Sequence, residues 1–424
     1  MQEYTGRQWL LINLATHFGK VDGKDLDKQI FEDRLAWGRD TLADLMNHTT
    51  DFDTYVAHVK TYVAEADEPE EFSACAIAIW DVLNDRSSNY VVGLDACNSG
   101  AQIMSAMGRC IIGMKNTGLI NTGIRPDLYQ VITDNIQGFF AERKIIKKGT
   151  VPHLYGSYAK PVEVFGEENY DAFIESCIKT MPMVEFIKDK LINAWNSKAD
   201  AHTIFMPDAG VAHMKVIDTV EYTGRFKGFN YTFHVQENKA KKFGEEGTTS
   251  LGANIIHPYD AYVLRELERR CDYNQKQVEY AKRVLTAFIL TGECGDTEEA
   301  KLLELQALSK VFNIVSFRGI EHVVDGKLAG VTEEYAMQLL VQCDEVLSLS
   351  TPFNLKCIHD EFGCLPNYVN TMKKHYNRIL ADTYMSTWIW DTIQLLTGDS
   401  FHHVVPKADL TIYNEILNNN YSIC

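Results

Sequence analysis

The first 90 residues carry apolar side chains at helical spacing. The clearest apolar segments are residues 9–16 and 35–45, and both are predicted to be helices. Residues 67–71 read Asp-Glu-Pro-Glu-Glu, which places carboxylates where a helix begins. We therefore expect this part of the chain to be mostly helical, and it contains no residues with an obvious chemical role.

After residue 100 the periodicity changes. Residues 101–140 are predicted to be helical, with a glycine-rich interruption at residues 116–123. Short strands are expected at residues 203–207, 214–219 and 229–235, with a turn at residues 208–210. Residues 270–345 are acidic and return to a helical pattern, so we expect a helical insertion there.

Two apolar segments are each followed by an aspartate at a predicted turn. Residues 346–355 have apolar side chains at odd positions, which predicts a strand, and residues 367–379 are predicted to be a helix. Residues 357–366 between them read Cys-Ile-His-Asp-Glu-Phe-Gly-Cys-Leu-Pro. This pattern predicts a strand–turn–helix corner with His359 and Asp360 at the turn.

The second run, residues 91–100, delivers Asp95 to the end of a short strand. An aspartate at a turn commonly hydrogen-bonds the nearby backbone and has no further role. Two strand-end aspartates held side by side would repel each other as anions, and divalent cations relieve that repulsion. Asp95 and Asp360 are therefore a candidate site for two magnesium ions.

A basic segment supplies possible phosphate ligands. Arg143 and Lys147 are four residues apart, and Tyr155 is eight residues beyond Lys147, so all three would share one face of a helix. Gly149 and Pro152 fall inside this helix, and we expect a kink there. Taken alone, a basic helix is more often a solvated surface than a binding site.

In order and internal spacing, these three segments resemble the signature motifs of the single-subunit RNA polymerases of T-odd phages and mitochondria. The matching residues are Asp95, Gly100 and Gln102 for the first motif, Arg143, Lys147, Tyr155 and Gly156 for the second, and His359, Asp360, Phe362 and Gly363 for the third. Residues 253–264 resemble the family helix that carries a functional histidine, here His257. Weaker likeness continues at residues 380–386 and 409–417, so that the resemblance spans nearly the whole chain.

The resemblance implies an α+β, mainly helical fold with the palm and fingers of a right-hand polymerase, and with the thumb and amino-terminal domain absent. It implies magnesium-dependent transfer of ribonucleoside triphosphates to an RNA 3′ end on a DNA template. Asp95 and Asp360 would hold the two magnesium ions, with the Ala96 carbonyl as a further ligand. Lys147 would act in catalysis and, with Arg143, bind the substrate. Substrate contacts are also expected from Tyr155, Gly156, His257 and Gly100.

The resemblance also suggests a division of the chain. We expect a helical palm-side region over residues 1–100, fingers over residues 101–250, and a palm with an insertion at about residues 270–345 over residues 251–424. Residues 203–250 resemble in position the hairpin with which the family reads promoter DNA. Within it, Lys239, Lys241 and Lys242 are candidate phosphate contacts.

Two other functions compete with this interpretation. Family-A DNA polymerases share a similar palm and basic helix, but they carry a glutamate five residues after the first aspartate, where this chain has Gly100, and an aromatic residue where it has Val151. Tyr155 and His257 are then free to recognise the ribose 2′-hydroxyl. An inactive nucleic-acid-binding relative is the second alternative, and the joint presence of both carboxylates and both cations disfavours it.

Composition and charge narrow the possible functions of this chain. The chain has 424 residues, 46% of them apolar, and no apolar run long enough to cross a membrane. Its ten cysteines form no C-x-x-C pair, so we expect reduced thiols in the cytoplasm of a phage-infected cell. The formal charge of −17 is unusual for a nucleic-acid enzyme. Either the basic residues gather in the cleft or another polypeptide supplies them.

One family segment, Asp/Thr-x-x-Gly-Arg, has no convincing counterpart here. The pentapeptide Glu-Tyr-Thr-Gly-Arg occurs at residues 3–7 and again at residues 221–225, and both copies are interpreted as chance matches because their positions are wrong. We therefore expect the catalytic, carboxyl-terminal half of a split podoviral enzyme. A partner subunit would supply the amino-terminal domain and palm arginine by docking on an apolar surface near the amino-terminal helices. A recruiting DNA-binding factor is a further possible partner.

Overall fold

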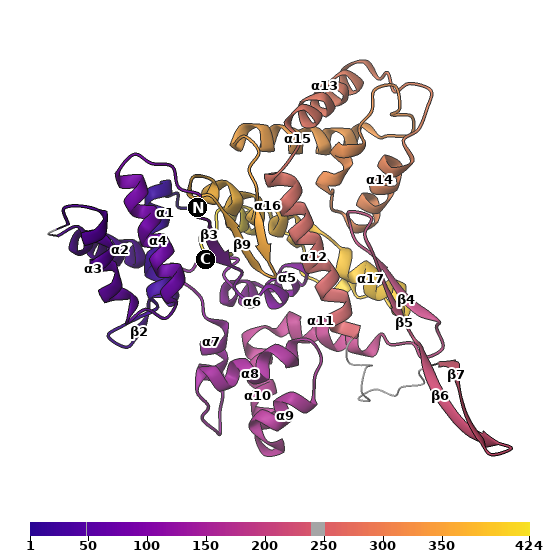
Figure 1. The fold of residues 1–424 in the computed structure, drawn as a ribbon. Helices are drawn as coiled ribbons and strands as arrows, with labels where there is room; N and C mark the ends of the chain where they lie inside the picture. Colours follow the sequence, from indigo (N-terminus) through magenta and orange to yellow (C-terminus); the bar gives the residue numbers. More distant parts are fainter. Residues whose placement is uncertain (48, 239–250) are drawn as a thin grey trace.

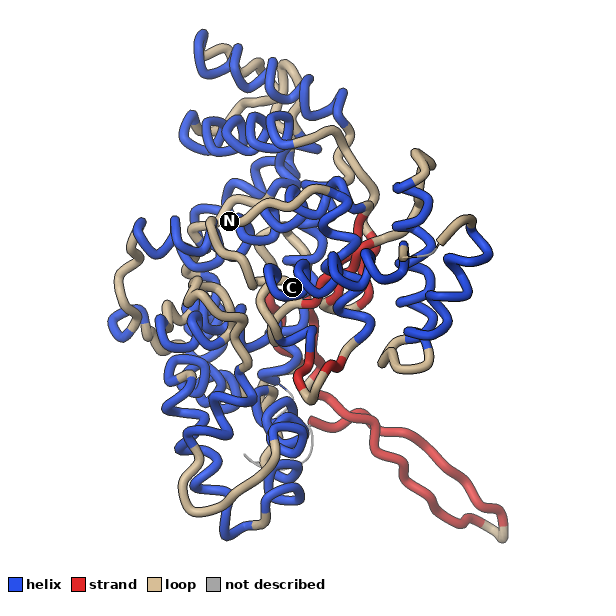
Figure 2. The backbone as a smooth tube through the Cα atoms, turned by 90° about the vertical axis from the view of Figure 1, so that its left-hand side faces the viewer, coloured by secondary structure: helices blue, strands red, loops and turns tan. Residues whose placement is uncertain are grey.

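The computed structural model describes residues 1–47, 49–238 and 251–424. Helices dominate these residues, and the strands form four small antiparallel sheets within them (Figure 1). Figure 2 shows the same arrangement from the side, with a central strand region surrounded by helices and one long hairpin that points away from the body. The expected mainly helical α+β class is confirmed.

An amino-terminal helical bundle packs on one side of the molecule (Figure 1). Its elements are α1 (Gly6–Phe18), β1 (Lys20–Val21), β2 (Lys24–Asp25), η1 (Leu26–Lys28), α2 (Phe31–Met46), α3 (Phe52–Val63) and α4 (Pro69–Leu83). α1 is buried on nearly every side, which its continuous apolar run Trp-Leu-Leu-Ile explains, and Thr5 and Gln8 form a capping box at its start. The helices predicted at residues 9–16 and 35–45 are confirmed, and α4 begins inside the predicted acidic break.

A three-stranded antiparallel sheet lies at the centre of the chain. It consists of β3 (Val92–Asp95), β9 (Glu361–Cys364) and β8 (Lys356–Ile358) in the order β3-β9-β8. α5 (Ser99–Met107), α12 (Leu251–Cys271) and α16 (Val369–Met385) pack together around this sheet (Figure 1). The sheet therefore joins residues near the start of the chain to residues near its end.

The corner at residues 357–366 differs from the prediction. It is a strand–turn–strand hairpin, because β8 and β9 pair through Ile358 and Glu361 and leave His359 and Asp360 as the turn. The strand predicted at residues 346–355 was also wrong, since residues 346–349 are the last turn of α15 (Glu333–Leu349). Helical spacing outweighs the apparent alternation here, because the buried residues of α15 follow a three-to-four spacing. The helix predicted at residues 367–379 is confirmed as α16.

Helices α6 to α11 form the lower part of the molecule in Figure 1. They are α6 (Ile111–Asn116), α7 (Leu128–Asn135), α8 (Arg143–Leu154), α9 (Ala159–Phe165), α10 (Glu167–Thr180) and α11 (Pro182–Asn193). The glycine-rich interruption is confirmed as the connection between α6 and α7. α8 continues through Gly149 and Pro152 and ends at Leu154, so Tyr155 lies one residue beyond the helix rather than on its face.

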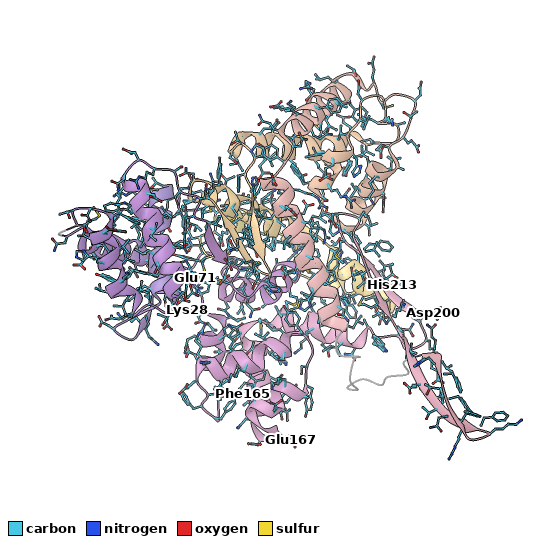
Figure 3. The ribbon with its side chains drawn as sticks, viewed as in Figure 1. Lys28, Glu71, Phe165, Glu167, Asp200 and His213 are labelled. Carbon is cyan, nitrogen blue, oxygen red and sulfur yellow. The ribbon has the colours of Figure 1, made fainter. Side chains whose placement is uncertain are left out.

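Two hairpins follow α11. β4 (Ala201–Phe205) pairs with β5 (Val211–Lys215), and β6 (Ile217–Phe226) pairs with β7 (Phe229–Asn238). Figure 3 labels Asp200 and His213 beside the first hairpin, and the second extends from there away from the body. The change to strands is confirmed, whereas Lys239, Lys241 and Lys242 lie outside the described residues.

The insertion at about residues 270–345 is helical, as predicted, and has a hydrophobic core of its own. It contains α13 (Gln275–Thr291), α14 (Ala300–Phe312), η2 (Phe317–His322) and α15. Glu266 of α12 ties it to the body, because this buried carboxylate accepts hydrogen bonds from the Ser316 hydroxyl and from the Phe317 N–H.

The last residues of the sequence return to the central sheet. After the short η3 (Pro366–Tyr368) and α16 come α17 (Trp388–Thr397), η4 (His402–Val404) and α18 (Leu410–Leu417). Residues 421–424 are then buried beside β3, where Ile423 forms a bridge with Ala96. Among the described helices, none is both long enough and apolar enough to cross a membrane.

Candidate active site

A cleft of about 280 Å³ brings together the acidic and basic residues predicted from three separate segments. Asp95 reaches it from the end of β3 and Asp360 from the β8–β9 turn, while Arg143 and Lys147 reach it from α8. Its other lining residues include Lys28, Asn98, Arg125, Asp127 and Tyr129. Figure 3 labels Lys28 on the side of the amino-terminal bundle that faces the middle of the molecule.

The two aspartates are adjacent because of strand register. Asp95 is the cross-strand partner of Glu361, so Asp360 lies one residue beyond the end of β3. The Ala96 N–H donates a hydrogen bond to the Asp360 carbonyl at 3.0 Å and fixes this turn against the strand. His359, before Asp360, adopts a left-handed backbone conformation with φ of 56° and is exposed. Its backbone closes the two-residue turn that carries Asp360.

Electrostatics in the cleft disfavour the ionised form of Asp95. The side chain is exposed to the cleft, yet desolvation by the surrounding walls, followed by the charges of Glu361 and Asp360, raises its pKa to about 6. A bound divalent cation would oppose this shift because it stabilises the carboxylate. The chemistry of the donors therefore fits magnesium, which prefers oxygen ligands.

The Ala96 carbonyl is compatible with the ligand role that the resemblance implies for it. It accepts a hydrogen bond from the Asn98 N–H at 2.9 Å. A carbonyl oxygen has two lone pairs, so one acceptor position remains for another partner. Asp95, Asp360 and Ala96 thus offer three oxygen donors at one edge of the cleft.

We expect the pKa of Asp95 to fall when Asp360 is replaced by asparagine, because a like charge is removed. The raised pKa also determines how the free energy of unfolding depends on pH. Protonated Asp95 stabilises the folded state, and this contribution is fully present below pH 3.8 and is lost as the pH rises through about 6. Titration of the Asp95 carboxyl carbon by NMR measures both variants. A pKa that is equal in Asp360→Asn and the parent chain would contradict the proximity of the two charges.

Arg143 and Lys147 are held on one aromatic platform. The Arg143 guanidinium lies 5.4 Å and the Lys147 ammonium 5.7 Å from the centre of the Tyr129 ring. Arg143 also pairs with Asp127, whereas the Tyr129 hydroxyl accepts a hydrogen bond from the Asn98 side chain at 3.1 Å. Asn98 caps α5, and so this platform is tied to the chain segment that follows Asp95.

The cleft is locally basic in an acidic protein. Lys28 and Arg125 add two cations to Arg143 and Lys147, and the lining carboxylates are Asp95, Asp127 and Asp360. The overall charge of −17 left two alternatives, basic residues gathered in the cleft or basic residues on another polypeptide. The four cations that line the cleft agree with the first alternative. Sequence reasoning missed Lys28 and Arg125, because each comes from a loop or short turn without a periodic pattern.

Tyr155, His257 and Gly100 meet beside this cleft. The ring centroids of Tyr155 and His257 are 4.5 Å apart. The Tyr155 hydroxyl lies so close to Gly100 that a Cβ atom on residue 100 would be 2.5 Å from the hydroxyl oxygen. Gly156 has a φ of +93°, a conformation that other residues rarely adopt, and it lets the chain turn directly after Tyr155. Burial, with the charges of Asp260 and Asp360, raises the pKa of Tyr155 to about 12 and keeps its hydroxyl protonated.

Asp260 lies beside Tyr155 and His257, and it was not predicted as a site residue from the sequence. It lies three residues after His257 on α12, and it accepts a hydrogen bond from the Ser99 hydroxyl at 3.1 Å. Desolvation is the main cause that raises its pKa to about 6, with a further contribution from the charge of Asp360. The helical spacing from His257 is the signal that could have identified it.

Gln102, which belongs to the resemblance, and Arg7, which belongs to the chance match at residues 3–7, do not line the cleft. Gln102 is buried and structural, since its side chain donates to the Thr117 and Ser422 carbonyls at 2.8 and 3.0 Å. Arg7, the arginine of the pentapeptide at residues 3–7, is exposed and is not among the residues that line the cleft. This position agrees with a chance match at residues 3–7.

A larger cavity, of about 690 Å³, lies beyond the end of α8 between α10 and α11, away from Asp95 and Asp360. Its walls are mostly apolar. At its edge, His153, Cys177 and Glu185 place possible metal-binding atoms within 4.8 Å of one another. The Lys188 ammonium donates to Glu185 at 2.5 Å and already balances the charge of this carboxylate. The acidic and basic chemistry of the smaller cleft, rather than cavity size, identifies the candidate active site.

Comparison with known proteins bears on the same residues. Residues 2–160 match the family model described as DNA-dependent RNA polymerase. This range contains Asp95, Gly100, Arg143, Lys147 and Tyr155, while Asp360 lies beyond it. No curated protein sequence matches the chain. This match, over somewhat more than a third of the chain, supports the resemblance to the single-subunit, phage-type RNA polymerases.

Proposed function

We propose that this chain is the catalytic subunit of a DNA-directed RNA polymerase that transcribes viral DNA. It would transfer ribonucleotides from their triphosphates to the 3′ end of an RNA product in a magnesium-dependent reaction. The observation that carries the proposal is the convergence of Asp95, Asp360, Arg143 and Lys147 on one cleft. Paired carboxylates and paired cations are the two components that templated nucleotidyl transfer needs.

The roles follow from the chemistry of each side chain. Asp95 and Asp360, with the Ala96 carbonyl, would hold two magnesium ions, which lower the pKa of the attacking 3′-hydroxyl and stabilise charge on the leaving pyrophosphate. Lys147 and Arg143 bind the triphosphate. Tyr129 orients both cations, because their charged groups lie over its ring. The pairing of Arg143 with Asp127 keeps its guanidinium in the cleft.

We assign the parts of the chain on this basis. The central sheet and α16 would be the palm, and residues 101–250 would be the fingers with α8 as the nucleotide-binding helix. Residues 1–100 would be a palm-side helical region, and residues 251–424 complete the palm and carry the insertion at about residues 270–345. The separate hydrophobic core of the insertion supports its treatment as an added unit.

Selection of ribonucleotides is assigned to Tyr155 and His257. Their rings are in contact, and the protonated Tyr155 hydroxyl lies next to the backbone of Gly100, close to the start of α5. We expect Tyr155→Phe to weaken discrimination against deoxynucleotides by roughly ten- to a hundredfold and to spare most of the ribonucleotide rate. Primer extension with mixed ribo- and deoxynucleotides measures the ratio. Unchanged discrimination would remove Tyr155 from this role and direct the test to His257.

A DNA polymerase is the first alternative function. The close approach of Tyr155 to Gly100 disfavours it, because a glutamate at position 100 would collide with the tyrosine hydroxyl at its first side-chain atom. An inactive nucleic-acid-binding relative is the second alternative. The raised pKa of Asp95 disfavours it, since desolvation and the neighbouring carboxylates, which cause the shift, make this arrangement costly to keep without a cation to bind it.

The β6–β7 hairpin is assigned to promoter DNA. Cross-strand register gathers Tyr222, Phe226, Phe229, Tyr231 and Phe233 on one of its faces, and all five are exposed. Arg225 and Lys227 add positive charge at the tip, where no acidic residue lies between positions 224 and 230. Aromatic side chains beside cations suit contact with nucleic acid.

We expect the double variant Phe226→Ser, Phe229→Ser to weaken promoter binding about tenfold or more, since two aromatic contacts are lost at the tip. Thr232→Ala on the opposite, polar face of the hairpin is the matched control and should bind DNA normally. Fluorescence anisotropy with labelled promoter DNA at fixed salt measures both. Equal affinity of the double variant and the control would remove the hairpin from DNA recognition.

A second polymerase subunit remains part of the proposal. The acidic net charge supports it, because the RNA–DNA hybrid requires a basic channel that a partner could supply. The expected apolar docking surface is small, however: the large apolar side chains exposed on the described amino-terminal helices are Met46, Phe52 and Ile77, each about two-fifths exposed. Polar contacts would then contribute much of the interface. Extension assays with and without a basic partner test this requirement.

A further inference from the structure

Two cysteine sulfurs meet at the edge of the cleft. The Sγ atoms of Cys97 and Cys424 are 3.3 Å apart, although the residues are separated by 327 positions in the sequence. Cys97 follows Asp95 by two residues and lines the cleft. Cys424 lies against β3, where its N–H donates to the Asp95 carbonyl at 2.9 Å.

The backbone holds the two cysteines in this arrangement. Ala96 and Ile423 form an antiparallel bridge, and the Cys97 N–H donates to the Ser422 carbonyl at 3.3 Å. The buried Lys373 ammonium donates to the Ile423 carbonyl at 2.6 Å and fixes the segment from its other side. The sulfurs therefore need to approach by only about 1.2 Å to reach the length of a disulfide bond.

Cys97 makes the pair accessible from the cleft. Arg125 donates a hydrogen bond from Nε to the Cys424 sulfur at 3.1 Å. Arg125 and Cys97 line the cleft, so a small oxidant can reach Cys97 through the space that nucleotides would use, and the buried Cys424 sulfur lies next to it. By contrast, Cys75 is fully buried and its sulfur donates to the Leu10 carbonyl.

We propose that Cys97 and Cys424 are an oxidisable thiol pair, which a peroxide converts to a disulfide at the edge of the cleft. One sulfur of the pair attacks one peroxide oxygen, and the O–O bond breaks to give a sulfenic acid and hydroxide. The other sulfur then attacks the sulfenic sulfur, and the S–O bond breaks with loss of hydroxide. The two thiol protons neutralise both hydroxides, so two thiols and one hydrogen peroxide give one disulfide and two waters.

Oxidation would change the end of β3, the strand that carries Asp95. The disulfide ties residues 421–424 covalently to the residue that follows Ala96, and closing the sulfur gap moves the backbone next to Asp95 and Ala96. Metal binding depends on the placement of both residues, so the oxidised chain should be a poorer enzyme. This consequence rests on the proposed polymerase function, whereas formation of the disulfide does not.

The chemical test uses the full chain, reduced and freed of thiols, and then treated with hydrogen peroxide. Non-reducing peptide mass spectrometry should find the peptides of Cys97 and Cys424 linked, with a loss of two hydrogens, before other cysteines react. Cys424→Ser should abolish the link, and Cys75→Ser, a buried cysteine elsewhere, should preserve it. The proposal is overturned if the natively folded chain keeps both thiols, or if each is oxidised to a sulfonic acid without pairing.

A functional measurement separates this site from the proposed activity. Magnesium-dependent extension should fall at least about tenfold on oxidation and recover with dithiothreitol, whereas Cys424→Ser should resist peroxide. A chain that forms the link but makes no RNA in either state would contradict the polymerase proposal and leave the thiol pair standing. A chain that makes RNA and forms no link would contradict the thiol pair alone.

Discussion

Asp95→Asn and Asp360→Asn should each lower magnesium-dependent RNA synthesis by at least about a thousandfold, which corresponds to about 4 kcal/mol of lost transition-state stabilisation. Asparagine keeps the size of the side chain but removes the negative charge that holds a cation. Because desolvation, followed by the charges of Glu361 and Asp360, destabilises Asp95 as an anion, its neutral replacement should not weaken the fold. Extension of a primed template at several magnesium concentrations measures the effect.

The matched control is Asp53→Asn, an exposed carboxylate in the first turn of α3 within the amino-terminal bundle. It should retain full activity and shows that loss of one negative charge elsewhere is harmless. Thermal melting and DNA binding should be nearly unchanged in all three variants. If Asp95→Asn or Asp360→Asn kept a rate within about tenfold of the parent, that residue would not be a primary metal ligand.

The core of the site could be predicted because its residues lie on regular elements. Asp95 closes an apolar strand, and Arg143 and Lys147 are four residues apart on a helix, so a local pattern is sufficient to place each of them. Their convergence could not be derived from local patterns, since it depends on β3 pairing with a strand more than 250 residues later. The family resemblance supplied that long-range information.

The predictions that were wrong or incomplete also have physical causes. The β8–β9 hairpin was missed because its strands are three and four residues long and its turn lacks glycine; His359 instead adopts a positive φ. The end of α15 was mistaken for a strand because a short apolar run satisfies both periodicities. Lys28, Arg125 and residues 421–424 enter the site from segments without any pattern, where tertiary packing alone decides the position.

The second large effect is expected at Gly100, where the smallest substitution should be disruptive. A Cβ atom at this position would lie 2.5 Å from the Tyr155 hydroxyl and 3.1 Å from the ring carbon that carries it. Contacts this short force a shift of either α5 or Tyr155, at a cost of roughly 1–3 kcal/mol. Because α5 follows Asp95 directly and Tyr155 follows α8, Gly100→Ala should raise the KM for ribonucleotides about tenfold or more and lower sugar discrimination.

The contact can be isolated with a double variant. Tyr155→Phe removes the oxygen that is closest to position 100, and the next contacts, at 3.1 and 3.3 Å, are tight but tolerable with a small movement of the ring. Gly100→Ala combined with Tyr155→Phe should therefore recover much of the ribonucleotide KM and thermal stability that Gly100→Ala loses. KM values and melting temperatures of the parent, both single variants and the double variant complete the cycle. Strictly additive effects would mean that Gly100 and Tyr155 do not touch, and the assignment of ribose selection to this contact would fail.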